Sequence, residues 1–467
     1  MKFSIALILL ISVIILIPEL VSGRDNIKTE IPLEPMIISG LVLVIVYVLI
    51  AFDLIHRTLA ALLGASTILF ISTTLGAFNK NYQILSFNDA IDAIDFNVVF
   101  LLMGMMIIVA IMRGTGVFQW TAYKSYELAK GDIWRLTIIL MIVTAVLSAL
   151  LDNVTTILLL TPVTIEIALI LRITPWALIF PEIMASNIGG TATLIGDPPN
   201  ILIGSSSGLS FNAFLFNLGP IALITLLTLI GMMYFFFRKE YKKSKNSNVP
   251  ELLKRLKREY KIENQALLNQ CLIVLGFVIV LFFLHDELKM EPSIAAMTGA
   301  MILLLISRTH IGEMLDEVEW PTLVFFMMLF IIVGAAEKNG LIPAIAEIVV
   351  QISGKDPTST IVIVIWISGI MSAIVDNIPF TASMIPVVEY LNQVIPGIDP
   401  NILWWALALG ADFGGNATII GASSNIVAAG IAERSGYAIR FKDFIKIGMP
   451  VAIVSMILST AYLLIRY

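Results

Sequence analysis

The sequence predicts an all-α polytopic membrane protein made of two inverted repeats, and three observations lead to this fold class. The 467 residues are 58% hydrophobic and 13% charged, with a mean hydropathy of +0.94, whereas a soluble domain carries about 25% charge. Apolar runs of about 20 residues, long enough for the ~30 Å hydrocarbon layer, recur along the chain. Two runs are interrupted by similar segments, "NIGGTATLIGDPPN" at 187–200 and "DFGGNATIIGASSN" at 412–425.

The composition excludes several classes of site. Cys271 is the sole cysteine, which excludes a disulfide framework and a multi-thiolate metal site. Three histidines, at 56, 285 and 310, are too scattered to form a zinc site. Because no nucleophile–base pair or metal cluster stands out, we expect neither an enzyme nor a bound cofactor. Nothing in the sequence indicates a nucleic-acid partner.

The first unit, residues 1–34, has two interpretations. "MKFSIALILLISVIILIPELVSG" combines a basic residue, an apolar run and small residues near Ser22, as a signal peptide cleaved after residue 23 would. It also reads as a retained membrane helix, and the sequence leaves both open.

The next unit, 35–237, is the first predicted repeat. Its expected spans are 35–55, 57–77, 95–113, a stretch at 133–171 interrupted at Asp152-Asn153, a helix from 174 into the break at 187–200, and 212–237. A basic linker follows at 238–264, with ten Lys/Arg and four Glu. The positive-inside rule places this linker in the cytoplasm, and the same loop-charge bias places Tyr467 outside.

The last unit, 265–467, is the second predicted repeat. Its expected spans are 265–285, 292–307, 320–336, a stretch at 358–392 interrupted at Asp376-Asn377, a helix from 401 broken at 412–425, and 444–465. The interruptions of the two halves match with an offset of 224 residues, and the glycine-rich segments match with 225. Each half has an odd number of crossings, so the repeats are predicted to be inverted. Inverted repeats with broken helices are typical of secondary transporters, whose site lies where the repeats meet.

Polar residues in the interruptions are the predicted site. Asp152, Asn153 and Thr155 in the first half correspond to Asp376 and Asn377 in the second. The aspartates have two compatible roles, as N-caps of the second arms of two hairpins or as groups that bind a proton or Na⁺. Na⁺ would be held by Asp152, Asn153, Asp376 and Asn377.

The two broken helices supply the remaining candidates. They are Asn187, Gly189, Gly190, Thr191, Thr193, Asp197 and Asn200 in the first break, with Asp412, Gly414, Gly415, Asn416, Thr418 and Asn425 in the second. The glycines are expected to permit unwinding and close approach, while the amides and hydroxyls donate and accept hydrogen bonds. Asp197 aligns with Ala422, so it is either a coupling residue or a cap of the next helix. Gly104, in an ordinary span, is expected to tolerate valine better than Gly190 or Gly415.

"DNVTTILLLTPV", "NIGGTATLIGDPPN", "VDNIPFTASMIPV" and "GADFGGNATIIGASSN" together resemble the ion transporter superfamily. Within it, residues 35–465 are similar to the permease group that includes the P protein, the arsenite pump membrane subunit and NhaD-type antiporters. This resemblance implies paired re-entrant hairpins, elevator-type movement of a transport domain, and a homodimer in the cell membrane. The Ser-Asn-Thr found at both tips in divalent-anion symporters is replaced here by Asp152-Asn153-Val154 and Asp376-Asn377-Ile378.

Two functions follow from these motifs and the resemblance. The first is H⁺- or Na⁺-coupled transport of a small inorganic anion or hydroxide species such as arsenite, for which hydroxyl and amide donors lie between protonatable aspartates. The second is Na⁺/H⁺ antiport. A dicarboxylate or citrate symporter is disfavoured because paired carboxylates repel such a substrate. A chloride-conducting channel is disfavoured as well.

Overall fold

The computed structural model describes residues 32–242 and 260–467, and these residues form helices joined by short connections. The predictions for the N-terminal segment, and those for linker residues 243–259, lie outside the described residues. Ten of the described helices are long and apolar enough to cross a membrane. The prediction of an all-α polytopic membrane protein is confirmed.

The helices begin and end close to the predicted spans. The first half contains α2 (Leu33–Ala51), α3 (Arg57–Phe78), α4 (Phe87–Asp92), α5 (Phe96–Arg113), α6 (Val117–Ala129), α7 (Ile133–Leu150), α8 (Asn153–Ile170), α9 (Trp176–Thr191), α10 (Pro198–Ser207) and α11 (Phe211–Tyr241). The second half contains α13 (Gln265–Leu284), α14 (Pro292–Ser307), α15 (Ile311–Asp316), α16 (Trp320–Lys338), α17 (Leu341–Ser353), α18 (Pro357–Ile374), α19 (Asn377–Val394), α20 (Ile402–Gly415), α21 (Ser423–Arg434) and α22 (Phe441–Arg466).

Four helices, α4, α6, α15 and α17, were not expected from the sequence, and the two longer ones are α6 and α17. Each has 13 residues, which is too short to cross the hydrocarbon layer, and therefore neither satisfies the length criterion for a span. Both start after a glycine with a positive φ, 78° at Gly116 and 81° at Gly340. A left-handed residue turns the chain sharply, and glycine adopts it without a Cβ clash. Each helix thus connects a span to the following hairpin.

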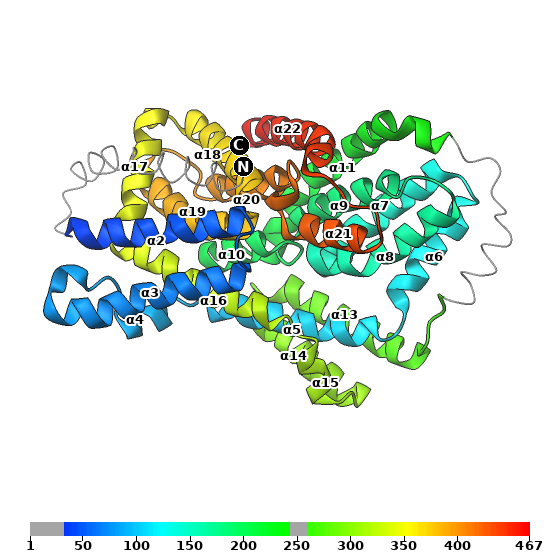
Figure 1. The fold of residues 1–467 in the computed structure, drawn as a ribbon, viewed down its shortest axis with the longest axis horizontal. Coiled ribbons are helices and arrows are strands. Elements are labelled where there is room, and N and C mark those ends of the chain that lie inside the picture. Colours follow the sequence, from blue (N-terminus) through cyan, green and yellow to red (C-terminus); the bar gives the residue numbers. More distant parts are fainter. Residues whose placement is uncertain (1–31, 243–259) are drawn as a thin grey trace.

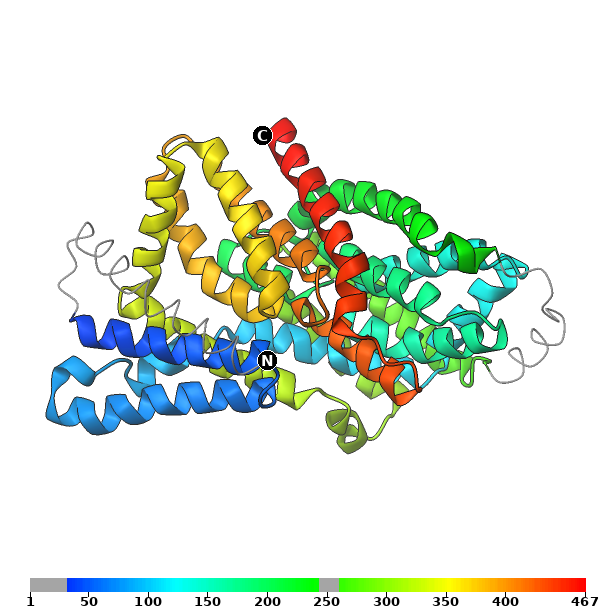
Figure 2. The same cartoon turned by 45° about the horizontal axis from the view of Figure 1, so that its top comes forward.

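The two halves interlock at the centre of the molecule. Helix α10 packs against α19, and α21 packs against α8, so a short helix from each half covers the hairpin of the other half. Helices α9 and α20 also contact each other there. Figures 1 and 2 show α9, α10, α20 and α21 in the middle, with α2, α3, α4 and α17 at one end of the long axis and α6 at the other.

The breaks begin later than the sequence predicted. Helix α9 continues to Thr191 and α20 continues to Gly415, so the segments without α-helix are 192–197 and 416–422, and the second contains a short 3-10 helix, η2 (Ile419–Gly421). The glycines at the ends of these helices allow close packing, not unwinding. A Cβ on Gly189 would lie 2.2 Å from the carbonyl oxygen of Ala145, and one on Gly414 would lie 2.3 Å from that of Gly369. Small residues commonly let membrane helices approach in this way.

Candidate functional site

Both hairpins turn at an Asp-Asn pair, and each aspartate caps the helix that follows. Asp152 Oδ1 accepts a hydrogen bond from the backbone N–H of Thr155 at 2.7 Å, and Asp376 Oδ1 accepts one from Ile378 at 3.1 Å. The capping interpretation of these aspartates is therefore correct in both hairpins. We call the two turns the first tip (151–155) and the second tip (375–379). Both tips point into the region where α10 and α21 begin.

Asp197 connects the two tips. Its Oδ2 accepts a hydrogen bond from Asn153 Nδ2 at 2.6 Å, and its Oδ1 accepts one from Asn377 Nδ2 at 3.3 Å. Asp197 occupies the N-cap position of α10 but caps no backbone N–H group of that helix. The alternative that it is a simple helix cap is thus wrong. Its side chain is 1% exposed, and no basic residue forms an ion pair with it within the described ranges.

Asn187 links the two broken helices. Its Nδ2 donates to Asn416 Oδ1 and to Asn425 Oδ1, both at 2.9 Å, and its Oδ1 accepts from Asn153 Nδ2 and from Ser424 Oγ. All the hydrogen-bonding capacity of this amide is used, which fixes its orientation. Asn187 therefore holds the first tip and the start of α21 against the end of α20.

Two further asparagines hold the broken segments in shape. Asn200 Nδ2 lies 3.0–3.3 Å from three carbonyl oxygens, those of Gly190, Thr191 and Thr193. Asn425 Nδ2 donates to the carbonyls of Gly415 and Thr418 at 2.8 Å. These carbonyls belong to helix ends and to the breaks, where the regular i+4 N–H partners of an α-helix are missing.

The threonines of the breaks donate to backbone carbonyls. Thr193 Oγ1 donates to Ala149 at 2.6 Å, and Thr418 Oγ1 donates to Ala373 at 2.7 Å. Each break is thereby tied to the last turn of the first hairpin arm of its own half. Thr191 Oγ1 donates to Asn187 within α9.

Several buried oxygens of the site accept no hydrogen bond from any described residue. They are both carboxylate oxygens of Asp412, Asn153 Oδ1 and Asn200 Oδ1. Asp412 is fully buried and lies beside the side chains of Thr191 and Asn200, although neither hydroxyl nor amide donates to it with good geometry. Asn416 Nδ2 is a donor that likewise has no partner among the described residues. Buried polar groups are almost always satisfied in proteins, so this cluster of acceptors is the candidate binding position.

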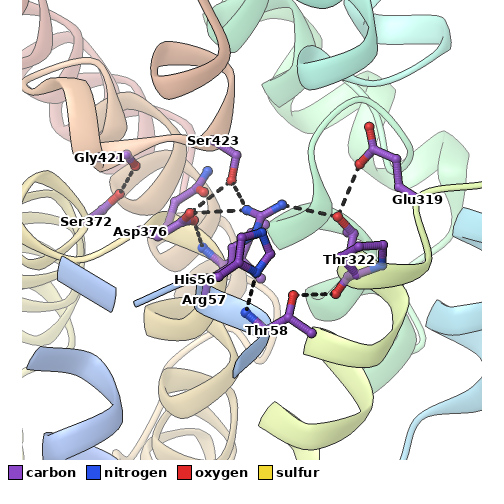
Figure 3. A network of polar contacts seen from close by, with 12 residues as sticks. His56, Arg57, Thr58, Glu319, Thr322, Ser372, Asp376, Gly421 and Ser423 are labelled. Carbon is purple, nitrogen blue, oxygen red and sulfur yellow. Dashed lines mark hydrogen bonds and ion pairs between the residues drawn. The ribbon is translucent and has the colours of Figure 1, made fainter. Parts of the chain in front are cut away.

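Arg57, which sequence reasoning missed, completes the second tip. Its Nη1 donates to Ser423 Oγ and lies 3.6 Å from Asp376 Oδ2, while Ser423 Oγ also donates to Asp376 at 2.9 Å (Figure 3). Arg57 is the first residue of a span, where a basic residue is normally taken to reach for the membrane surface. The one feature of the sequence that could have drawn attention to Arg57 is its position in the short loop at 56–57, between two predicted spans.

A small cavity lies between the first tip and the start of α16. Its volume is about 30 Å³, enough for a water molecule or a small ion. Asp152 and Thr155 of the first tip line it, together with Glu319, Thr322 and Arg57. No group of three His, Cys, Asp or Glu side chains arranged for a metal ion occurs in the described parts of the chain.

Comparison with known proteins gives consistent matches. A family model described as "Citrate transporter" (CitMHS) matches residues 47–410. An uncharacterised transporter of Mycobacterium tuberculosis is 40% identical over 432 residues, which is 92% of this chain and 98% of the relative. A 46 kDa membrane protein of Mycobacterium leprae is 41% identical over 92% of this chain and 99% of its own length.

A mammalian protein and a solved structure extend these matches. The human P protein is 35% identical, and the alignment covers 95% of this chain and 61% of that protein. The crystal structure of the Alcanivorax borkumensis YdaH transporter superposes with a TM-score of 0.62 at 12% identity. It covers 88% of this chain and 98% of that one, so the likeness extends over the fold as a whole.

Proposed function

Because the chain belongs to the citrate transporter family, we propose that it is a secondary active transporter that uses H⁺ or Na⁺ as its coupling ion. Membership of this family makes the chain a multi-pass membrane transporter and not an enzyme. The proposal adds the coupling ion, its site and the class of substrate.

The group of buried oxygens around Asp197 and Asp412 carries this proposal. An isolated ionised carboxylate is very costly in a medium of low polarity, so it takes up a proton or binds a cation. Asp412 has no ion-pair partner among the described residues, and Asp197 has amide donors alone. The unsatisfied amide oxygens of Asn153 and Asn200 are the oxygen ligands that hard cations such as Na⁺ prefer.

This position suits coupling because it joins both halves. Asp197 holds the amides of both tips, and Asp412 comes from the broken helix of the second half. A cation bound here would stabilise one arrangement of tips and breaks over another, as coupling requires. We further propose that the halves are inverted repeats and that the protein works by an elevator mechanism as a homodimer.

The chemistry of the cavity favours a small uncharged or weakly charged substrate. One guanidinium and two carboxylates line it, so a citrate trianion would meet net negative charge. We therefore propose a small inorganic anion or hydroxide species of the arsenite type, although the family description names citrate.

Na⁺/H⁺ antiport is the second candidate. The pair of buried carboxylates at 197 and 412 favours it, since protons and Na⁺ would compete for the same oxygens.

Transport by purified protein in proteoliposomes tests the proposal. Arsenite, Na⁺ and citrate are offered under an imposed pH or Na⁺ gradient, with Asp197→Asn as the test variant. We expect Asp197→Asn to lower coupled transport about 100-fold, since hydrogen bonds to a charged group contribute about 1.5–3 kcal/mol and each 1.36 kcal/mol is tenfold in rate. Asp356→Asn, which alters an exposed cap of α18, is the matched control. Gradient-driven transport at wild-type rate by Asp197→Asn would refute the coupling site.

A further inference from the structure

Arg57 contacts two parts of the molecule that would move relative to each other in the elevator mechanism proposed above. On one side its Nη1 reaches Ser423 and Asp376, which belong to α21 and the second tip. On the other side its Nη2 donates to Thr322 Oγ1 of α16 at 3.2 Å (Figure 3). The guanidinium thus bridges α16 and the second tip.

The attachment of Arg57 to α16 is the firmer of the two. The next residue, Thr58, donates its hydroxyl to the carbonyl of Pro321 at 2.7 Å, and the guanidinium lies 5.5 Å from the ring centroid of Phe325. Helices α3 and α16 also pack along their length. Arg57 itself reaches the second tip through Asp376 and the start of α21 through Ser423, and Tyr47 of α2 also donates to the carbonyl of Pro379 in the second tip.

A second carboxylate lies close to the guanidinium on the α16 side. Thr322 Oγ1, which accepts from Arg57, donates to Glu319 Oε2 at 3.1 Å. One hydroxyl group therefore separates Arg57 from Glu319, and both residues line the cavity beside the first tip.

An arginine remains charged at any physiological pH, so it cannot leave Asp376 by losing its proton. Leaving a partly buried guanidinium unpaired is costly, and an alternative carboxylate within reach removes most of that cost. The arrangement has the form of a two-state element in which one cation has two acidic partners.

We propose that Arg57 is a positioning residue with two alternative partners. It holds the second tip against α16 by pairing with Asp376, and it pairs with Glu319 instead when the tip moves away; we call this contact the latch. The latch rests on the elevator mechanism proposed above and does not depend on which cation is coupled. It gives Glu319 a role in release, although Glu319 does not contact Asp376.

Labelling of an introduced cysteine measures release directly. Val154 lines the cavity at the first tip, and Val154→Cys in a Cys271→Ser background provides one thiol for a methanethiosulfonate reagent. Release of the second tip opens the cavity and speeds labelling. We expect Glu319→Gln to slow labelling about tenfold, because release then leaves Arg57 without a carboxylate.

The matched control is Glu317→Gln, which removes the carboxylate two residues away that pairs with Arg113. This control should leave the labelling rate unchanged. The double variant Arg57→Gln/Asp376→Asn removes the latch without leaving an unpaired charge, and it should speed labelling about tenfold. The melting temperature of each purified variant is measured in parallel.

Two results would overturn the latch. One is equal labelling rates for Glu319→Gln and Glu317→Gln in proteins of equal melting temperature. The other is unchanged labelling in the folded double variant. Neither readout requires transport or a bound cation, so the latch and the coupling site can fail independently.

Discussion

The first and second tips share a sequence motif but have different electrostatic surroundings. Both aspartates cap the following helix, and both asparagines donate to Asp197. Asp376 is 3% exposed and lies beside Arg57, whereas Asp152 is more exposed and shares a cavity with another acid, Glu319. The backbone role of the motif is common to the tips, and the charge that surrounds each is set by distant helices.

This difference assigns the aspartates different tasks. Asp376 already has a cation partner and a hydroxyl donor, so its charge is compensated within the protein. Asp152 has no ion-pair partner within the described residues, so we propose it as the tip carboxylate that meets an incoming cation. The two hairpins thus have equivalent helix caps. The residues that surround each cap differ, and they give the two aspartates different electrostatic surroundings.

The largest effects are expected where the two halves are alike, at the glycines that precede the breaks. A Cβ on Gly190 would lie 2.5 Å from the carbonyl oxygen of Gly196, and one on Gly415 would lie 2.7 Å from that of Gly421. Valine at either position should destabilise the fold by about 3 kcal/mol or more, the upper range for overpacking. Detergent-stable yield and substrate binding should both be lost.

The control for these valines is Gly430→Val in α21, where a Cβ meets no atom within 4 Å. Gly104, expected from the sequence to be mild, is unsuitable, since its Cβ would lie 2.8 Å from the backbone carbon of Ala296. Normal yield and binding by Gly190→Val with loss by Gly415→Val would show that the breaks are not equivalent.

The spans could be predicted because they are long apolar runs, and the breaks because glycine, proline and acidic residues interrupt such runs. The ends of α9 and α20 could not be predicted. In a sequence, a glycine that lets two helices pack closely cannot be distinguished from a glycine that ends a helix. Gly189 is of the first kind, with its Cα against Ala145.

The residues of the candidate site were likewise predictable in part. Polar residues within apolar runs identified Asn153, Asp197 and Asn187, because such residues are costly unless they face a cavity or each other. Arg57 could not be found, as its partner Asp376 lies 319 positions away and a basic residue at a span end normally meets solvent. Contacts between distant helices, not local patterns, decide such pairs.

A smaller effect should separate the two aspartates. Asp152→Asn and Asp376→Asn are both expected to abolish coupled transport. Asparagine can cap a helix, but at position 152 it cannot hold a proton or a full charge, and at position 376 it cannot form the ion pair with Arg57. Asp376→Asn should also lower stability by about 1–2 kcal/mol, a figure reduced from that of a fully buried pair because Arg57 is partly exposed. Asp152→Asn should have the same melting temperature as the wild type.

Thermal melting in detergent and transport in proteoliposomes, measured on the same preparations, give both readouts. Adding Arg57→Gln to Asp376→Asn should recover part of the lost stability, since no unpaired guanidinium remains. Equal melting of the two aspartate variants would show that Arg57 contributes nothing at the second tip.

The smallest effect is expected at an exposed ion pair, Asp89 of α4 with Lys338 of α16, which has the same charges as the pair at the second tip. The hydrogen bonds from Lys338 and Ser86 lower the pKa of Asp89 to about 2, below its ordinary value of 3.8. Its stabilisation is therefore fully present above pH ~4 and is lost as the pH falls through 2. Because exposed pairs are screened by salt, Lys338→Gln should change neither the melting temperature at pH 7 nor the transport profile between pH 5 and 8. A shift of that profile by Lys338→Gln would mean that charge pairs far from the tips set the pH dependence, and the contrast between Asp152 and Asp376 could not then account for it.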